Sequence, residues 1–150
     1  MAQSTEIAAL LAEKAVLITY SPLRTEVDWR TVFSIPDGIR VLEIPPRASL
    51  DPVQKAWETN TFAGGESTVI FVPGRKFDAA GTRHGQGGGW YDRFLANVPR
   101  EWLRIGFCYH EQFSEKPLPR ASHDQAMDYV VVLDRASGVS TLYSSEGLHD

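Results

Sequence analysis

The sequence predicts an α/β sandwich that forms one domain. Short apolar runs rich in Val, Ile and Leu recur along the chain, and such runs are typical of strands buried on both faces. Segments with helical spacing or helix-start residues separate several of these runs, and this alternation is typical of α/β proteins. The length of 150 residues fits a single compact domain, so we expect residues 1–150 to fold as one unit.

Composition limits the classes of protein to which the chain can belong. A net charge of −4 argues against non-specific binding to nucleic acid. No apolar segment is long enough to span a membrane, and the N-terminus lacks the basic and apolar regions of a signal peptide. We therefore expect no membrane partner and a cytoplasmic location. The single cysteine, Cys108, excludes an intrachain disulfide, and its apolar neighbours favour core packing over a reactive thiol.

The first part of the chain contains two predicted helices and two predicted strands. They are a helix over residues 4–14, strands over residues 15–20 and 39–44, and a helix that begins at Asp51-Pro52. Ser4 or Thr5 can cap the first helix, since a hydroxyl there accepts from a free backbone N–H. Gly64-Gly65 marks the loop after the second helix.

The second part of the chain is predicted to contain most of the sheet. Its elements are a buried strand over residues 68–72, a helix that starts at Trp90 and is closed by Pro99, strands over 103–109 and 129–133, and a final strand over 139–143. Turn residues 134–138 join the last two strands, so we expect a hairpin at the edge of the sheet.

A glycine segment (residues 81–89) separates the strand over 68–72 from the helix that follows. Five glycines fall within it, the last three consecutive. Glycines allow positive φ and let backbone N–H groups approach a ligand without a Cβ in the way. Because the segment leads into a helix start, a phosphate or carboxylate is the ligand we expect there. The alternative is a flexible surface loop.

Two familiar phosphate-binding motifs do not fit the glycine segment. The P-loop requires Gly-Lys-Ser/Thr, and no such tripeptide occurs in the chain. The dinucleotide fingerprint requires a third glycine three positions after the second, and from Gly85 and Gly87 that position is Trp90. The segment therefore belongs to another class of anion site.

A set of short motifs spread over about half of the chain resembles the signature of 5-formyltetrahydrofolate cyclo-ligases, also called methenyltetrahydrofolate synthetases. The matching residues are Val72-Pro73-Gly74, Phe77-Asp78, Gly81, Arg83, residues 85–95, Ile105-Gly106-Phe107, Glu111-Gln112, Pro117-Leu118-Pro119, His123-Asp124 and Asp128. The resemblance implies a three-layer α/β/α sandwich with a mostly parallel sheet, the fold shared with sugar-phosphate isomerases and CoA transferases. Active sites in such sheets lie beyond the carboxyl ends of the strands.

The resemblance also implies an activity. Members of the family use ATP and Mg²⁺ to convert 5-formyltetrahydrofolate to 5,10-methenyltetrahydrofolate. Phosphoryl transfer depends on positioning and charge neutralisation, which cations, backbone N–H groups and a metal provide. Arg83 is the candidate catalytic phosphate clamp, because its planar fork matches phosphate oxygens. Asp92 and Asp124 match the family's Mg²⁺ ligands, and carboxylates suit that hard ion.

The remaining site residues follow from the same motifs. The implied ATP-binding residues are Arg83, His84, Gly85, Gln86, Gly87, Gly88, Gly89, Trp90 and Tyr91. The implied substrate-binding residues are Glu26, Gln86, Gly87, Gly88, Gly89 and Trp90. Glu26 is the candidate partner of the pterin, since a carboxylate can accept from two adjacent ring N–H donors.

Structural roles are the alternatives for these residues. Glu26 could cap a helix over residues 29–33, and Asp92 and Asp124 could act as helix-terminal or capping acids. Arg83 could be an ordinary surface arginine. No histidine is assigned as a metal ligand, because the histidines show no ligand spacing with a cysteine or with each other.

The chain departs from the family in its positive charges. Family members begin with a helix bearing a Lys-x-x-x-Arg type of pattern, and no such pattern precedes Ala15. Gln86, at a position that is often basic, is uncharged, and residues 47–67 are shorter than usual. We therefore expect slow turnover. The alternative is a degenerate member that binds folate or nucleotide without efficient catalysis. The sequence leaves monomer and homodimer open.

Overall fold

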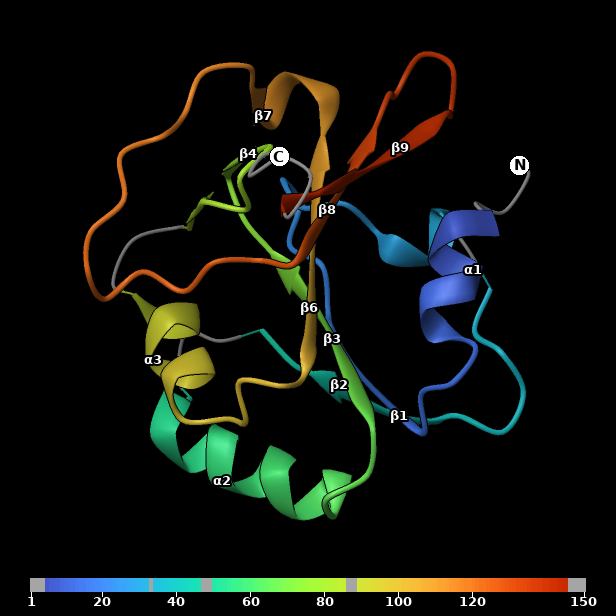
Figure 1. Cartoon of the computed structure of the whole chain (residues 1–150), viewed down its shortest axis with the longest axis vertical. Helices are drawn as coiled ribbons and strands as arrows, with labels where there is room; N and C mark the ends of the chain where they lie inside the picture. Colours follow the sequence, from blue (N-terminus) through green and yellow to red (C-terminus); the bar gives the residue numbers. More distant parts are fainter. Residues whose placement is uncertain (1–4, 33, 47–49, 86–88, 146–150) are drawn as a thin grey trace.

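The computed structural model describes residues 5–32, 34–46, 50–85 and 89–145. Its centre is a six-stranded sheet in the order β2-β1-β3-β6-β8-β9 (Figure 1). These strands are β1 (Val16–Tyr20), β2 (Arg40–Ile44), β3 (Thr68–Pro73), β6 (Leu103–Tyr109), β8 (Tyr129–Leu133) and β9 (Ser140–Ser144). All neighbouring pairs are parallel except β8 and β9, which form an antiparallel hairpin at the edge of the sheet. The predicted mostly parallel sheet and its final hairpin are confirmed.

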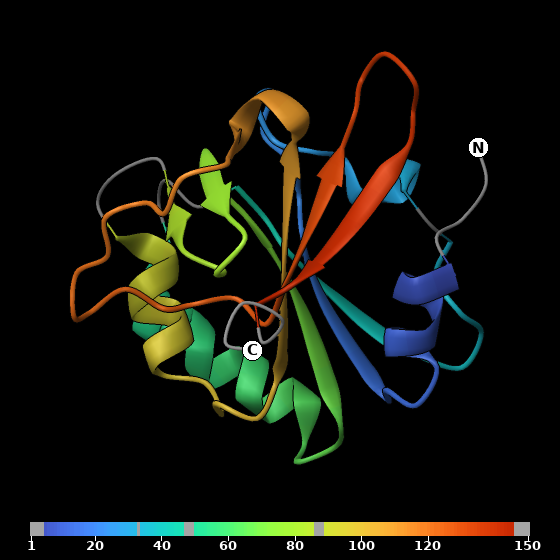
Figure 2. The same ribbon diagram turned by 45° about the horizontal axis from the view of Figure 1, so that its top comes forward.

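Helices cover both faces of the sheet. They are α1 (Thr5–Leu11), α2 (Pro52–Ala63) and α3 (Trp90–Ala96), with short 3-10 turns at η1 (Trp29–Thr31) and η2 (His110–Gln112). Figures 1 and 2 show α2 and α3 together on one face and α1 on the other. Ala56 and Phe94 share a buried core with Ile70 on the first face, and Leu11 shares one with Phe71 on the second. The α/β/α arrangement is therefore as predicted.

Local sequence explains where α2 begins and ends. The side chain of Asp51 accepts a hydrogen bond of 3.2 Å from the backbone N–H of Val53, and Pro52 occupies the first turn, where its missing N–H costs nothing. Gly64 ends the helix in the left-handed conformation at φ 61°. The Asp-Pro start and the Gly-Gly end were both readable in the sequence.

A second, smaller sheet was not predicted. It contains β4 (Lys76–Asp78), β5 (Arg83–His84) and β7 (Phe113–Ser114) in the order β5-β4-β7. Figure 1 shows β4 and β7 beyond the carboxyl ends of β3 and β6. Strands of two or three residues are too short to show an alternating pattern, so they could not be predicted from the sequence.

The small sheet packs directly on the main sheet through Phe77. A Cβ built on Gly106 of β6 would lie 2.3 Å from a carbon of the Phe77 ring, and one built on Gly74 would lie 2.9 Å from the same ring. Both glycines leave room for this fully buried ring. Close approach of an aromatic ring to the backbone therefore fixes β4 over the ends of β3 and β6.

Cys108 lies in the core, as the sequence predicts. It is fully buried on β6. Burial raises the pKa of its thiol to about 12, and the charge of Glu111 acts in the same direction. The thiol therefore stays protonated at neutral pH and packs as a small apolar side chain.

We expect Gly106→Ala to lower the free energy of unfolding by about 1–3 kcal/mol, because the added methyl overlaps the Phe77 ring. Urea denaturation measures the loss. Phe77→Leu removes part of the ring, so Gly106→Ala should cost less in that background than in the wild type. Equal costs in the two backgrounds would show that the Phe77 ring is not what requires a glycine here.

Candidate functional site

The candidate site lies at the carboxyl edge of the sheet. Because β1, β3 and β6 are parallel, the loops that follow them meet at one edge. The Gln112 side chain after β6 donates a hydrogen bond of 3.1 Å to the backbone carbonyl of Thr25 after β1. Loops that are distant in the sequence are therefore joined at this edge.

Glu26 is buried in the loop after β1. Its side chain is held by the backbone N–H of Leu23, which donates to Oε1 at 2.9 Å, and the residue is 5% exposed. The capping alternative is wrong, because the turn η1 is capped by Asp28, whose carboxylate accepts from the backbone N–H of Arg30. Contact of Glu26 with a pterin stays a prediction.

Tyr20, the last residue of β1, holds the loop that follows this strand. Burial raises the pKa of the Tyr20 hydroxyl well above its ordinary value, and the charge of Glu26 raises it further. The Tyr20 hydroxyl donates to the backbone carbonyl of Val27 at 2.6 Å, which fixes this loop. Because β1 and β3 are parallel, this loop and the segment after β3, which carry the predicted folate-side and nucleotide-side residues, leave the same edge of the sheet.

Arg83 is not an ordinary surface arginine, because it is only 8% exposed. Its Nε donates a hydrogen bond of 2.6 Å to the backbone carbonyl of Pro73, and its guanidinium lies 5.0 Å from the centre of the Tyr91 ring. A Cβ built on Gly85 would lie 2.8 Å from Nη2 of this guanidinium. The terminal nitrogens of Arg83 therefore lie against Gly85, in the middle of the glycine segment.

Trp90 and Tyr91 form an aromatic layer at the start of α3. The Trp90 indole N–H donates to the backbone carbonyl of Leu50 at 3.1 Å, and its ring stacks on Phe94 with centroids 5.3 Å apart. Gly89 precedes them at φ 67°, a conformation that favours glycine. Ligand contacts of Trp90 and Tyr91 stay predictions. Gln86, Gly87 and Gly88 lie outside the described residues.

The β7–β8 connection (residues 115–128) contains no helix or strand and runs over the small sheet. Asp78, 2% exposed, accepts hydrogen bonds of 2.8 Å from the backbone N–H groups of Thr82 and Leu118. Nε2 of His84 lies 2.8 Å from the backbone carbonyl of Pro119. These contacts hold the first half of the connection against β4 and β5.

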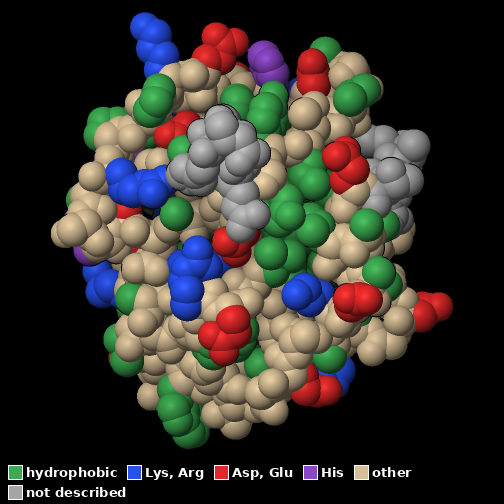
Figure 3. Space-filling model, viewed as in Figure 1, with side chains coloured by type: hydrophobic (Ala, Val, Ile, Leu, Met, Phe, Trp, Pro, Cys, Tyr) green, Lys and Arg blue, Asp and Glu red, His purple; other side chains and the backbone are tan. Residues whose placement is uncertain are grey.

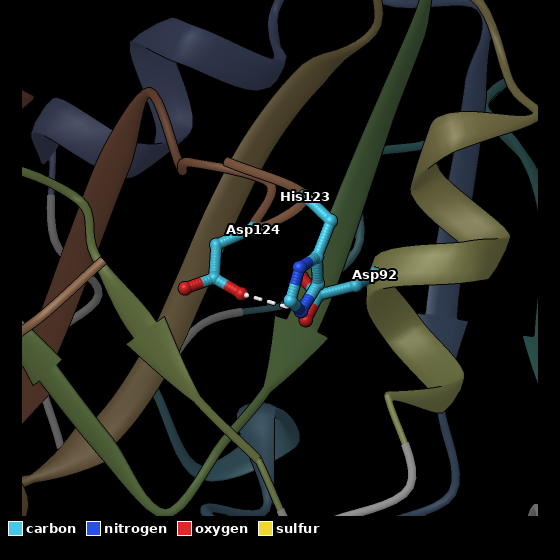
Figure 4. Close-up of side chains that lie close together, drawn as sticks. All are labelled: Asp92, His123 and Asp124. Atoms are coloured by element: carbon cyan, nitrogen blue, oxygen red, sulfur yellow. Dashed lines mark ion pairs between the residues drawn. The ribbon is translucent and has the colours of Figure 1, made fainter. Parts of the chain in front are cut away.

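The β7–β8 connection brings Asp124 and His123 to Asp92 of α3 (Figure 4). One ligand atom from each of the three side chains lies within 4.8 Å of the other two. Asp92 accepts a hydrogen bond of 3.0 Å from the backbone N–H of Gln125, and Asp124 accepts one of 2.7 Å from Ala121. Nε2 of His123 lies 3.4 Å from Oδ1 of Asp124. Asp124 makes a local backbone bond, as its capping alternative requires, whereas Asp92 bonds to a residue that is distant in the sequence. Both carboxylates face one common point.

His123 is a candidate ligand that sequence reasoning missed. Its position next to Asp124 was visible, but the approach of Asp92 depends on the path of the β7–β8 connection. Arg93 was also treated as structural. A cavity of about 290 Å³ is lined by Gly89, Asp92, Arg93, Ala96 and His123. It places a guanidinium, a carboxylate and an imidazole around one space.

Residues 3–133 match the profile of the 5-formyltetrahydrofolate cyclo-ligase family. The chain belongs to this family. The 5-formyltetrahydrofolate cyclo-ligase of Mycolicibacterium smegmatis is 34% identical over 71 residues, which cover 47% of this chain and 36% of that protein. The match therefore spans little more than a third of that relative's length.

A solved structure shows the same fold. The 5,10-methenyltetrahydrofolate synthetase from Mycoplasma pneumoniae superposes with a TM-score of 0.56 over 85% of this chain and 79% of that chain. The two sequences are 20% identical, so this likeness concerns the fold alone.

Two features of the described residues bear on binding to nucleic acid and to membranes. On the face shown in Figure 3, Lys and Arg side chains are interspersed with Asp and Glu side chains and form no continuous basic surface. Among the described residues, none of the helices has the length and apolar character needed to cross a membrane.

Proposed function

We propose that the chain is an ATP- and Mg²⁺-dependent 5-formyltetrahydrofolate cyclo-ligase. The observation that carries the proposal is the meeting of two separate family motifs in space. Asp92 comes from the motif at α3 and Asp124 from the motif in the β7–β8 connection, and their carboxylates lie within 4.8 Å of each other at the edge where active sites of such sheets occur. Membership of the family over residues 3–133 supplies the reaction.

In the proposed reaction, the N5-formyl oxygen of 5-formyltetrahydrofolate attacks the γ-phosphorus of ATP, and ADP leaves. N10 of the folate then attacks the activated formyl carbon, and phosphate leaves to give 5,10-methenyltetrahydrofolate. The protein contributes mainly positioning and charge neutralisation. Its residues must therefore hold the triphosphate beside the formyl group and exclude competing water.

Arg83 and the glycine segment are proposed to hold the nucleotide. The bond from Nε to Pro73 fixes the guanidinium, and its terminal nitrogens border Gly85, where they can donate to phosphate oxygens. The nucleotide-binding set is the one that the sequence predicts, residues 83–91. Arg93 adds a second guanidinium in the wall of the neighbouring cavity.

Asp92 and Asp124 are proposed to hold Mg²⁺. Their donor atoms fit the ion, because Mg²⁺ prefers oxygen ligands and commonly uses one or two carboxylates together with phosphate oxygens. When bound, the ion would neutralise negative charge on the phosphates. His123 supplies an imidazole nitrogen to the same cluster, a donor that suits transition metals better than Mg²⁺.

Glu26 is proposed to bind the folate. Its carboxylate is buried at the carboxyl end of β1, and the bond from Leu23 fixes Oε1 in place. A fixed carboxylate can accept from adjacent N–H donors of a pterin ring. Gln86, Gly87, Gly88, Gly89 and Trp90 complete the predicted substrate-binding set.

A second candidate function is binding of folate or nucleotide without efficient turnover. The composition of the glycine segment favours it, since Gln86 is uncharged and Arg83 is the segment's only Lys or Arg. Each charge-assisted hydrogen bond that is absent costs roughly 1.5–3 kcal/mol. The loss of one such bond in the transition state would slow the reaction roughly tenfold or more.

We expect slow formation of methenyltetrahydrofolate absorbance when the purified chain is given ATP, Mg²⁺ and 5-formyltetrahydrofolate. Gln86→Arg should raise the rate about tenfold, because it adds a cation to the glycine segment that is proposed to hold the nucleotide. Gln54→Arg on the exposed side of α2 is the matched control and should leave the rate unchanged. Folate or ATP binding by calorimetry without any turnover, in the wild type and in Gln86→Arg, would establish the second candidate instead.

Asp92→Asn and Asp124→Asn should each weaken Mn²⁺ binding at least tenfold, as followed by electron paramagnetic resonance with Mn²⁺ in place of Mg²⁺. Because two ligands of one ion are coupled, the double variant should add little to either single variant. Asp37→Asn, at an exposed residue, is the control for loss of a negative charge. Full additivity of the two changes would show that the carboxylates do not share one ion.

A further inference from the structure

Arg104 is a buried arginine on β6 whose side chain reaches two other elements. It is 1% exposed. Its Nη1 donates a hydrogen bond of 2.9 Å to Oε1 of Gln125, and its Nη2 donates one of 3.1 Å to the backbone carbonyl of Leu95. Its own backbone N–H donates to Oδ2 of Asp128 at 2.9 Å. One guanidinium therefore joins β6, α3 and the β7–β8 connection.

The two groups bonded by Arg104 belong to the segments that carry the paired carboxylates. Leu95 lies in the last turn of α3, and Asp92 lies in the first turn of the same short helix. Gln125 directly follows Asp124, and its backbone N–H donates to Oδ1 of Asp92 at 3.0 Å. Arg104 thus bonds to the side chain of Gln125, and Asp92 bonds to the backbone N–H of the same residue.

Burial of the Arg104 guanidinium carries a cost in stability. Burial lowers its pKa to about 10, Arg100 acts in the same direction, and Asp128 opposes the shift. The guanidinium is still charged at neutral pH, and its Nε donates to no acceptor in the part of the chain described. Replacing a buried charge of this kind by an apolar side chain is often neutral or stabilising. The cost of burial is therefore better explained by a positional role.

We propose that Arg104 is a positioning residue that fixes the β7–β8 connection against α3 and so sets the spacing of Asp92 and Asp124. It acts through Gln125 and Leu95 and needs the planar fork of arginine, because the two acceptors lie on different elements. A lysine has a single terminal nitrogen, so it cannot bond well to both acceptors. The inference rests on the proposed metal-binding role of the two aspartates.

Two variants separate this role from a purely structural one. Arg104→Met removes both bonds and keeps an unbranched apolar side chain, and Gln125→Ala removes the bonded side chain outside the core while keeping the backbone N–H. In the metal-free protein, amide exchange at Gln125 should become at least about tenfold faster in both variants. Mn²⁺ affinity should fall about 10- to 100-fold, the usual loss when a group supporting a metal ligand is removed.

Three further variants serve as comparisons. Arg104→Lys should restore part of the Gln125 protection and part of the Mn²⁺ affinity. Arg135→Met, at an exposed ion pair with Glu111, should change neither measurement. Val131→Ala, in the core on the other face of the sheet, shows how a general loss of stability changes amide exchange and Mn²⁺ affinity.

The readouts distinguish failure of the inference from failure of the proposed function. Unchanged Gln125 exchange in Arg104→Met, or in Gln125→Ala if Arg104→Met does not fold, overturns the positioning role. Faster exchange of this amide with unchanged Mn²⁺ affinity also overturns it, since the spacing of Asp92 and Asp124 would then not depend on Arg104 in a way that affects the metal. A wild-type chain that binds no Mn²⁺ overturns the metal site, and with it the purpose assigned to Arg104, whatever the exchange rates show.

Discussion

The candidate site depends on the hydrogen bonds that hold the β7–β8 connection. This connection has no regular secondary structure, so its backbone groups must find partners elsewhere. The buried carboxylate of Asp78 accepts from Leu118, the backbone N–H of Met127 donates to the carbonyl of Gly81 at 2.8 Å, and Asp92 accepts from Gln125. Each bond joins the connection either to the segment between β3 and α3 or to α3 itself. Together they place Asp124 beside Asp92.

These contacts give some motif residues a structural purpose distinct from ligand binding. Gly81 has φ 86°, and a Cβ built on it would lie 2.3 Å from the backbone oxygen of Met127. A side chain there would push the β7–β8 connection away from α3. Asp78 and Gly81 therefore hold the β7–β8 connection in place, whereas Asp92 lines the cavity beside α3 and Arg83 is proposed to hold the nucleotide. The motif combines both kinds of residue within a short stretch.

The sheet could be predicted from the sequence because its inner strands are buried on both faces. Every residue of β1 and β3 is buried, which produces the continuous apolar runs seen in the sequence. The small sheet could not be predicted, because its strands are too short to show a period. The burial of Arg104 could not be predicted for a different reason. A charged residue in an apolar run gives no indication of the partners that would make its burial tolerable.

The candidate site could be predicted only in part from the sequence, because it depends on contacts between distant segments. Asp92 and Asp124 were identified through the family motifs, and the structure brings them together. His123 was missed because its relation to Asp92 exists only in three dimensions. Burial and hydrogen bonds, which local sequence does not encode, exclude a surface role for Arg83 and a helix-capping role for Glu26, and the ligand contacts of both residues stay predictions.

The most direct test of the account is a crystal structure of the chain with Mn²⁺ and a non-hydrolysable ATP analogue, with the metal located by anomalous scattering. The account predicts one peak in contact with carboxylate oxygens of both Asp92 and Asp124, with the terminal phosphates between this peak and Arg83. A peak that contacts only one of these aspartates, or a metal–nucleotide complex bound away from the carboxyl edge of the sheet, would contradict it.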